Sequence, residues 1–513
     1  MSGDFNLTLF CEDNGPDADP SIQAICQLYQ VEFEDSTAGL NVFFLLFAGA
    51  AVFMMQAGFA MLCAGSIRSK NVKNIMLKNL LDACGGALGF FFLGYGLAYG
   101  GSDGGGVRFI GYNDFLLLET AKSDTPGEDY IFFFFQFAFA ATAATIVAGT
   151  VAERCKMSAY LCYSVFLTAV VYPVIVHAGW ASDGFLSAFN TGNLYMDQGA
   201  IDFAGSAVVH LTGGTTALIA AVILGPRRGR FYDDDGQPLE TPGIIKGHSA
   251  ALQVLGTFIL WFGWYGFNPG SALAGFGESP GYHDVVGLAA VTTTLAAASG
   301  AVGALAIDTF YEYTQTAEIS YEITMAMNGC LGGLVAITAG CSVIQPWVSV
   351  IVGFIGGIIY FSFSKFLVYF RIDDAVDAIP VHFANGIWGV IAVGLFSDPV
   401  LQLRTYGSNV HHGWFYNFSD AHLLLIEFIL VLFVIAWVSA CMIPFFVVLK
   451  CFGLFRVDPL EEEVGLDVSH HRGHAYYDDT PSASALQALN DSRHGGGVRN
   501  VLAKPEEDDA DGV

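Results

Sequence analysis

The sequence predicts an all-α polytopic membrane protein, and three observations support this fold class. Hydrophobic residues make up 54% of the 513 residues and charged residues only 13%, whereas soluble domains contain roughly 25% charged residues. Long apolar runs recur along the chain between short breaks, and about 20 such residues are enough to cross a bilayer as one helix. Basic residues gather in alternate breaks, as the positive-inside rule requires.

The apolar runs and the Gly, Pro and polar residues between them predict eleven transmembrane helices. Their expected positions are 40–63, 75–99, 131–152, 157–180, 203–224, 249–269, 285–306, 323–341, 347–369, 381–397 and 422–449. The first ten can be divided into two sets of five. Because five is odd, the second set would run inverted relative to the first, as in many transporters that bind their solute at the midplane. The eleventh is one extra helix.

The distribution of Lys and Arg predicts the orientation of these helices. Arg68 follows the first span, Arg154 the third, and Arg227 the fifth, whereas the alternate loops hold few basic residues. The positive-inside rule therefore predicts an N-terminus outside the cell and a C-terminus inside. No cleavable leader is visible before the first span, so we expect that span to act as its own insertion signal.

The chain is expected to have four parts: an extracellular tail over 1–38, a transmembrane domain over 39–450, a cytoplasmic regulatory tail over 451–477, and a tail over 478–513. The last part is rich in Ser, Asp, Gly and Glu, a composition that predicts disorder. The formal charge of -27 argues against a nucleic-acid partner.

The predicted outer face holds candidate modification sites. Asn6 and Asn417 each begin an Asn-x-Ser/Thr triplet and are candidate glycan acceptors, although such triplets are common by chance. Cys11 and Cys26 lie in the acidic tail, and in an oxidising compartment they would form a disulfide or remain as two thiols. We expect His411 and His412 to be solvated loop residues, and we expect no metal site.

Two histidines occur inside otherwise apolar spans. His210 lies eight residues after Asp202 in the fifth span, and His382 lies five residues after Asp377 in the tenth. At 1.5 Å per residue the imidazoles would lie roughly 12 Å and 8 Å from opposite faces of a ~30 Å core. An ionisable group within a span predicts a functional site. The alternative is a core histidine that bonds a neighbouring helix.

Several motifs in one order resemble those of a single family, the ammonium transporters, whose distant cousins are the Rhesus glycoproteins. The similarity runs from about residue 40 to about 475. The matching segments are Asp202-Phe-Ala-Gly-Ser with His210, Gly149-Thr-Val-Ala-Glu-Arg154, Gly263-Trp-Tyr-Gly-Phe-Asn-Pro-Gly-Ser271, Asp373-Asp374 with Asp377 and His382, and Glu461-Glu-Glu-Val-Gly465-Leu-Asp-Val-Ser469.

The resemblance implies a homotrimer with one pore per subunit between two inverted halves. It implies that Phe139, Trp180 and Ser271 form an outer ammonium vestibule, that Phe139 and Phe267 form a gate, and that His210 and His382 line the pore behind it. An aromatic face can attract a small cation by about 1–2 kcal/mol when it is partly desolvated. The alternative for Trp180 is an interfacial anchor at a span end, and for Phe139 it is core or lipid packing.

The resemblance also implies supporting roles outside the pore. Asp202 would act structurally and electrostatically at the mouth of the His210 span. Asp373, Asp374 and Asp377 would do similar work on the cytoplasmic side, at the mouth of the His382 span, or would lie in a solvated loop. The tail segment with Gly465 and Ser469 would regulate transport by docking on the neighbouring subunit, with Ser469 as a phosphate acceptor.

These features predict a plasma-membrane protein that takes up ammonium, with methylammonium as an analogue and with no cofactor. The net species is either ammonium, or ammonia with a separately routed proton. A Rhesus-type neutral ammonia channel and an ammonium sensor are the alternatives. We expect no enzyme, because the sequence has no nucleophile–base pair, metal-ligand spacing or nucleotide-binding loop.

Overall fold

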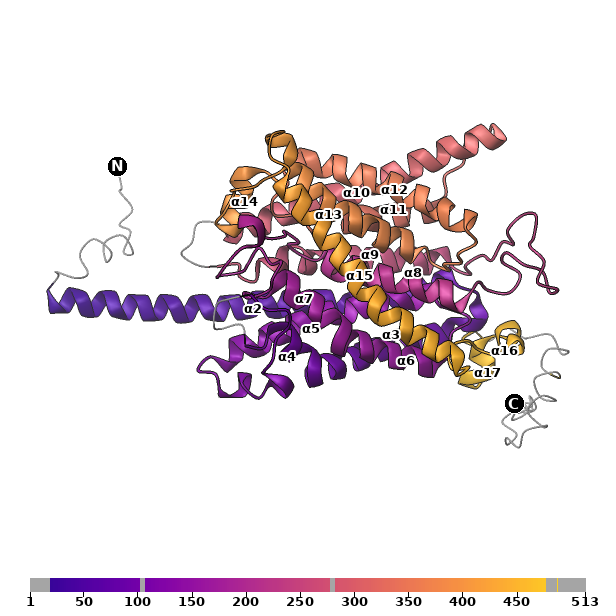
Figure 1. The fold of residues 1–513 in the computed structure, drawn as a ribbon, viewed down its shortest axis with the longest axis horizontal. Helices are drawn as coiled ribbons and strands as arrows, with labels where there is room; N and C mark the ends of the chain where they lie inside the picture. The colour runs from indigo at the N-terminus through magenta and orange to yellow at the C-terminus, as the bar shows by residue number, and fades with distance from the viewer. Residues whose placement is uncertain (1–18, 102–106, 277–281, 477–486, 488–513) are drawn as a thin grey trace, which may run out of the picture.

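The computed structural model describes residues 19–101, 107–276, 282–476 and 487, and over these residues it is helical without a β-strand (Figure 1). Ten described helical segments are long and apolar enough to span a membrane. They correspond to ten of the eleven predicted spans. The eighth predicted span corresponds to α11 (Ile323–Thr338), a shorter apolar helix of 16 residues. The all-α membrane fold class is therefore confirmed.

The elements of the first half are α2 (Pro20–Ser66), α3 (Val72–Gly89), α4 (Tyr95–Tyr99), α5 (Pro126–Thr150), α6 (Met157–Phe166), α7 (Tyr172–Trp180) and α8 (Thr212–Leu224). Those of the second half are α9 (Ala250–Phe267), α10 (Tyr282–Thr316), α11, α12 (Pro346–Tyr369) and α13 (Asn385–Phe396). The remaining helices are α14 (Pro399–Tyr406), α15 (His422–Cys451), α16 (Pro459–Val464) and α17 (Leu466–His471).

The first helix begins well before its predicted span. α2 starts at Pro20, where the Asp19 carboxylate accepts a hydrogen bond from Ser21 N at 2.9 Å. A side-chain acceptor followed by Pro at the first helical position is a strong helix start. As Figure 1 shows, the early part of α2 extends far beyond the bundle.

The two halves pack in equivalent ways. α3 lies against α6 and α5 against α8 in the first half, and correspondingly α10 lies against α12 and α11 against α13 in the second. α2 and α9, the first helices of the two halves, pack against each other along an extensive interface. This repeated pattern fits two related five-helix units. α15 covers both halves through α8 and α13.

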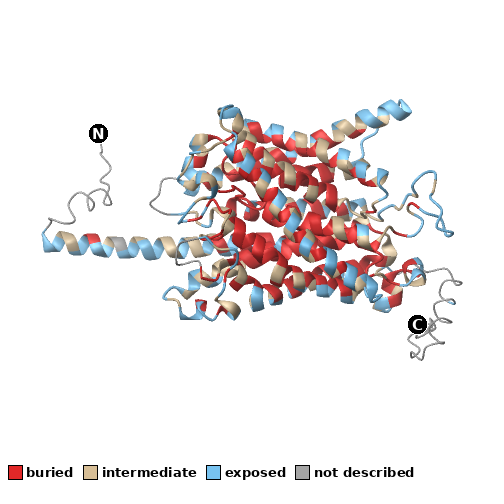
Figure 2. Cartoon of the chain, viewed as in Figure 1, coloured by how far each residue is buried: buried red, intermediate tan, exposed pale blue. Residues whose placement is uncertain are grey.

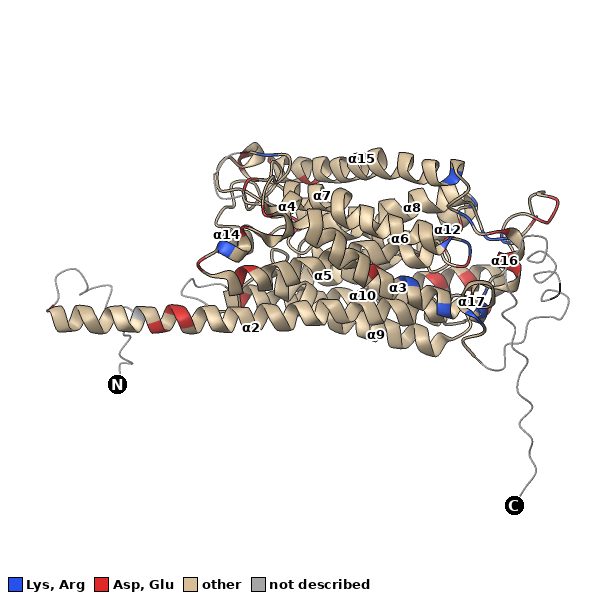
Figure 3. Ribbon diagram, turned by 90° about the horizontal axis from the view of Figure 1, so that it is seen from below, with Lys and Arg blue, Asp and Glu red and all other residues tan. Residues whose placement is uncertain are grey.

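Burial and charge follow the pattern expected of a membrane bundle. Figure 2 shows buried residues concentrated in the middle of the bundle and exposed residues on its outside and at its ends. Figure 3 shows Lys, Arg, Asp and Glu mainly at the two ends, with few charges between them. Many large apolar side chains remain exposed on the outer helix faces, including Phe258 on α9 and Leu432 on α15. In a membrane protein such faces contact lipid.

Candidate transport site

Both candidate pore histidines lie in wide helical turns at the start of their spans. His210 belongs to the π-helical segment η8 (Ser206–Leu211), which runs into α8. His382 belongs to the π-helical segment η10 (Ile379–Ala384), which runs into α13. π-helical turns are rare and occur frequently at functional sites. Each turn shifts the helix register and so sets the direction in which its histidine points.

The structure brings the two histidines together in the centre of the bundle. Their Nδ1 atoms lie 3.2 Å apart, and their rings are 5.2 Å apart between centroids and inclined by 22°. His210 is 0% and His382 4% exposed. A contact between two Nδ1 atoms requires one ring to donate a proton and the other to accept it. Two neutral imidazoles of opposite tautomer satisfy this requirement.

Glycines allow the two histidine helices to approach closely. A Cβ atom on Gly214 would lie 2.3 Å from Phe383 N, and one on Gly386 would lie 2.8 Å from Ser206 O. Atoms at these separations would overlap, so any larger residue would push the halves apart. Small residues at such crossings are characteristic of helix packing in membranes.

Two stacked phenylalanines lie beside His210. The rings of Phe139 and Phe267 are 4.1 Å apart and inclined by 23°, and Phe267 is 5.4 Å from the His210 ring. Phe139 and Phe267 are 1% and 0% exposed. The ring pair therefore fills the space between the histidines and the next cavity with apolar atoms.

That cavity is lined by all three predicted vestibule residues. It has a volume of about 180 Å³, and Phe139, Trp180 and Ser271 contribute to its wall. Trp180 Nε1 donates to Asp202 O at 2.6 Å, which fixes the indole. Ser271 Oγ donates to Phe267 O at 2.8 Å, which leaves the lone pairs of the hydroxyl as acceptors.

Asp202 holds the start of the His210 helix. Its carboxylate accepts from Gly205 N at 3.1 Å, Ala207 N at 2.9 Å and Val208 N at 2.8 Å. These are free N–H groups of a helix start, which a carboxylate satisfies and stabilises. Asp202 thus has the geometry of a cap, and it does not line the cavity.

In the second half, the equivalent cap is Asp374. Its carboxylate accepts from Ile379 N at 2.7 Å and Val376 N at 3.3 Å. Asp374 precedes His382 by eight residues, the same spacing as from Asp202 to His210. Asp377, which the sequence analysis paired with His382, instead accepts from the hydroxyls of Tyr360 at 3.0 Å and Ser364 at 2.9 Å on α12. The equal spacing was visible in the sequence and was missed there.

Trp264 is a further residue that the sequence analysis did not single out. Its indole lies 5.1 Å from the His210 ring at 18°, and its Nε1 donates to Thr338 Oγ1 at 3.0 Å. The stacked indole restricts the His210 ring on one face. Its place in Gly263-Trp-Tyr-Gly, three residues before Phe267, was the available signal.

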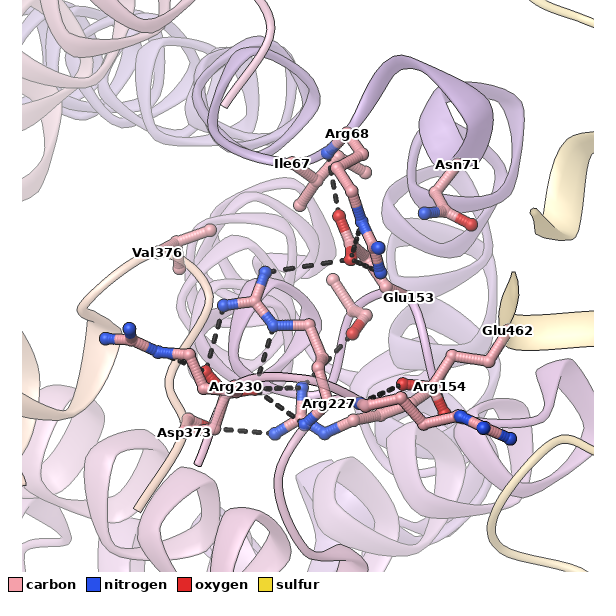
Figure 4. Close-up of polar contacts among 12 residues, drawn as sticks. Ile67, Arg68, Asn71, Glu153, Arg154, Arg227, Arg230, Asp373, Val376 and Glu462 are labelled. Carbon is pink, nitrogen blue, oxygen red and sulfur yellow. Dashed lines mark hydrogen bonds and ion pairs between the residues drawn. The ribbon is translucent and has the colours of Figure 1, made fainter. Parts of the chain in front are cut away.

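A buried charge network joins the loops that follow α2, α5, α8 and α12 (Figure 4). Arg227 Nε and Nη2 donate to Asp373 at 2.8 and 2.9 Å, and Arg154 Nη2 donates to Asp373 O at 2.7 Å. Arg68 Nε donates to Glu153 at 2.7 Å. Burial alone would raise the pKa of Asp373, but Arg154 and Arg227 hold it well below its ordinary value. Burial likewise opposes ionisation of Glu153, and Arg227 and Arg68 lower its pKa.

The tail helices dock at this same end, on the chain's own loops. Asp467 of α17 accepts from Lys73 N at 3.0 Å and Asn74 N at 2.9 Å, and so caps α3. Leu466 N donates to Asn71 Oδ1 at 2.9 Å. Gly465 has φ +109°, and a Cβ there would lie 2.7 Å from Lys70 Cβ. These contacts are all within one chain, and docking on a neighbouring subunit stays a prediction.

Arg456 connects the tail to the His210 helix. It donates to Leu224 O at 3.0 Å and Pro226 O at 2.8 Å, at the carboxyl end of α8. It also donates to Glu462 of α16 at 2.9 Å. Ser469 is 8% exposed, and its Oγ donates to Gly465 O at 3.0 Å.

The outer-face predictions are only partly within the described residues. Asn6 and Cys11 lie outside them. Cys26 is in a disulfide. Because Cys11 lies outside the described residues, the pairing of Cys11 with Cys26 stays a prediction. Asn417 is half-buried, and its Oδ1 accepts from Ser419 Oγ at 2.7 Å.

Together, the related halves, the buried histidine pair and the aromatic barrier define the class: a helical membrane transport protein. The chain belongs to the Ammonium Transporter Family, whose model matches residues 42–476. Membership supports ammonium transport, and it points to a transporter rather than an enzyme.

Individual relatives agree with this assignment. Ammonium transporter 1 member 1 of Oryza sativa subsp. japonica is 43% identical over 469 residues, which cover 90% of each chain. Among solved structures, one named Sensor Amt Protein is 34% identical with a TM-score of 0.70 and covers 85% of this chain and 99% of its own. The crystal structure of Candida albicans Mep2 is 25% identical with a TM-score of 0.71 and covers 94% of this chain and 100% of its own.

Proposed function

We propose that the protein takes up ammonium across the plasma membrane through a pore lined by His210 and His382. The observation that carries this proposal is a continuous row of ring contacts, in which each ring packs against the next. The row runs from Trp180 through Phe139 and Phe267 to His210. The Nδ1 atom of His210 then lies 3.2 Å from that of His382. This row of rings connects the cavity, which suits a small cation, to the buried histidine pair, which can exchange protons.

Recruitment takes place in the outer cavity. The face of Trp180 and the ring of Phe139 attract the cation, and the Ser271 hydroxyl oxygen accepts one of its N–H bonds. Sodium and potassium ions lack N–H groups, so they gain less binding energy in this cavity. The cap at Asp202 adds negative potential near this cavity.

Passage beyond Phe139 and Phe267 requires loss of hydration, because the stacked rings leave only apolar surface. Ammonia is much less costly to desolvate than a cation. The ammonium ion therefore gives up a proton before or at the histidine pair, and ammonia passes. The proton either crosses the membrane by a separate route or stays outside. The imidazole pair is suited to form hydrogen bonds with the neutral ammonia molecule.

Two alternatives make different predictions. A Rhesus-type neutral channel would give flux that tracks only the ammonia gradient. A sensor would signal normally when transport is abolished, and the solved relative named Sensor Amt Protein supports keeping this second candidate.

We further propose a homotrimer with its N-terminus outside and its tail inside. Lys and Arg gather at the end of the bundle where α16 and α17 lie (Figure 3), and Arg228 N donates to Glu462 of α16 at 2.8 Å, as the positive-inside rule requires of a cytoplasmic face. The tail would regulate transport from this face, since Arg456 and Asp467 bind the ends of α8 and α3.

Voltage-clamp recording in oocytes tests the proposal. With ammonium applied outside at two pH values, we expect a saturable inward current that persists at the lower pH. Trp180→Leu should weaken it by raising the ammonium concentration for half-saturation. Absence of current, with flux that follows the ammonia gradient, would favour the neutral channel instead.

A further inference from the structure

Three side chains of types that commonly ligate metals meet in the loop before α15 and at its first residue. His411 Nδ1 and Asp420 Oδ2 are 2.7 Å apart, and so are His422 Nδ1 and Asp420 Oδ1. The two imidazoles stack, with ring centroids 4.4 Å apart and planes inclined by 26°. One ligand atom from each residue falls within 4.8 Å of the others. The carboxylate thus lies between two imidazole nitrogens.

We propose that His411, Asp420 and His422 form a binding site for a divalent transition metal ion of the Zn²⁺ type. Two imidazoles and one carboxylate suit Zn²⁺, Cu²⁺ and Ni²⁺, whereas Mg²⁺ and Ca²⁺ prefer oxygen ligands alone. With metal–ligand bonds of about 2.0–2.2 Å, tetrahedral ligand atoms lie roughly 3.3 Å apart. The cluster needs only small side-chain movements to reach that spacing, and water would complete the coordination.

The backbone around the cluster holds these ligands in place. Asp420 N donates to Asn417 O at 3.0 Å, and His411 O accepts from Gln402 Nε2 at 2.8 Å. The side chains of His411 and Asp420 are 17% and 18% exposed, and that of His422 is 55% exposed. The ligands are therefore partly ordered before an ion binds, yet one side stays open for its entry.

The site bridges two segments that support the start of the pore helix. His411 N donates to Gln198 Oε1 at 3.4 Å, and Gln198 lies four residues before Asp202. His422 is the first residue of α15, whose buried Glu427 accepts from Ile201 N at 2.7 Å. A bound ion would cross-link the 407–421 loop to α15 and hold the segment that leads to Asp202. The inference does not depend on the transported species.

The competing interpretation is a hydrogen-bonded cluster without a metal. Asp420 Oδ1 accepts from His422 N at 3.0 Å, so Asp420 also caps the start of α15. Under that interpretation the histidines only orient the carboxylate. Substitution of either would change stability without changing metal binding.

The test uses the full chain purified in detergent with ZnCl₂ or MgCl₂ as the probe. Bound zinc is measured by equilibrium dialysis with elemental analysis, and thermal unfolding is followed with and without each salt. We compare the wild type with His411→Asn, His422→Asn and the control His412→Asn. His412 is adjacent in sequence, but its Nδ1 is 3.3 Å from Asn409 O and it is not part of the cluster.

We expect the wild type and His412→Asn to bind one zinc ion per chain and to gain thermal stability with ZnCl₂ but not with MgCl₂. His411→Asn and His422→Asn should bind zinc at least about tenfold more weakly, since loss of even an outer-shell partner costs that much. Zinc binding that is equal in all four proteins, or absent from the wild type, would overturn the proposal. A loss of stability in the two variants without a difference in bound zinc would assign the cluster to hydrogen bonding alone and would also overturn it.

Discussion

The Nδ1 atoms of His210 and His382 lie 3.2 Å apart although 172 residues separate them in the chain. Each histidine follows a capping aspartate by eight residues and lies in a π-helical turn at the start of a transmembrane helix. The same local arrangement, a capping aspartate followed by a π-helical turn, occurs once in each half and brings the two imidazole rings into contact.

The first prediction concerns the caps. Asp202→Asn leaves one acceptor oxygen where two now serve three backbone N–H groups, and Asp374→Asn weakens the equivalent cap. Loss of a buried charged hydrogen bond costs about 1–3 kcal/mol. Each variant should lower the thermal unfolding midpoint in detergent. The control Asp377→Asn keeps both caps, and a larger loss there than in Asp374→Asn would contradict the assignment.

The second prediction concerns the gate. Phe139→Ala removes one of the two stacked rings and opens apolar space between the cavity and His210. We expect water to enter and a potassium current, absent in the wild type, to appear in voltage clamp. Phe135→Ala is the matched control. The ring centroid of Phe135 lies 4.8 Å from that of Phe139, but Phe135 is not part of the Phe139–Phe267 stack. Equal potassium currents in both variants would contradict the assignment of Phe139 to the gate.

The third prediction concerns the buried network and pH. Glu153→Gln leaves Arg227 and Arg68 without their shared carboxylate, but Arg227 keeps Asp373, so the loss should lie below the about 3–5 kcal/mol of a fully broken buried ion pair. Because the folded state lowers the pKa of Glu153, its stabilising contribution is full above the unfolded pKa of about 4.3 and is lost as the pH falls through the folded value.

The stability gap between wild type and Glu153→Gln should therefore be widest near pH 7 and should narrow below about pH 4. Thermal unfolding across this range measures it. A gap that stays constant or widens with acid would show that Glu153 is not stabilised by its charge.

The fourth prediction concerns the tail. Ser469 is nearly buried where α17 docks, so Ser469→Asp places a charge in the docked segment and should release it. We expect altered ammonium flux with the oligomer intact, and the same from deletion after Arg456. Ser469→Ala removes the hydrogen bond to Gly465 O but adds no charge, and it should behave nearly as wild type. Unchanged flux in both the aspartate variant and the deletion would exclude regulation by this segment.

Much of this arrangement was predictable from the sequence because a bilayer imposes strong rules. Apolar run length placed the helical segments, and the rarity of ionisable groups inside such runs singled out His210 and His382. The early start of α2 at Pro20 was not predicted, because hydropathy reports the membrane span and not the whole helix.

The remaining details depend on contacts that no local pattern encodes. Apolar periodicity does not distinguish an α turn from a π turn, so the direction of each histidine was not predictable. The stacking of Trp264 on His210 depends on how α9 lies relative to η8, the segment that holds His210. The choice of Asp374 among Asp373, Asp374 and Asp377 as the second cap is the exception, because its eight-residue spacing to His382 equals that from Asp202 to His210 and was visible in the sequence.

The most direct test of the central claim is labelled methylammonium uptake into oocytes by wild type, His210→Asn and His382→Asn, with His412→Asn as a control of the same chemical change. Surface expression is matched by labelling. The proposal predicts saturable uptake in the wild type and the control, and a loss of about a hundredfold in both pore variants, the scale for removing a proton-transfer group. Unchanged saturable uptake in His210→Asn and His382→Asn would contradict the histidine-pair mechanism.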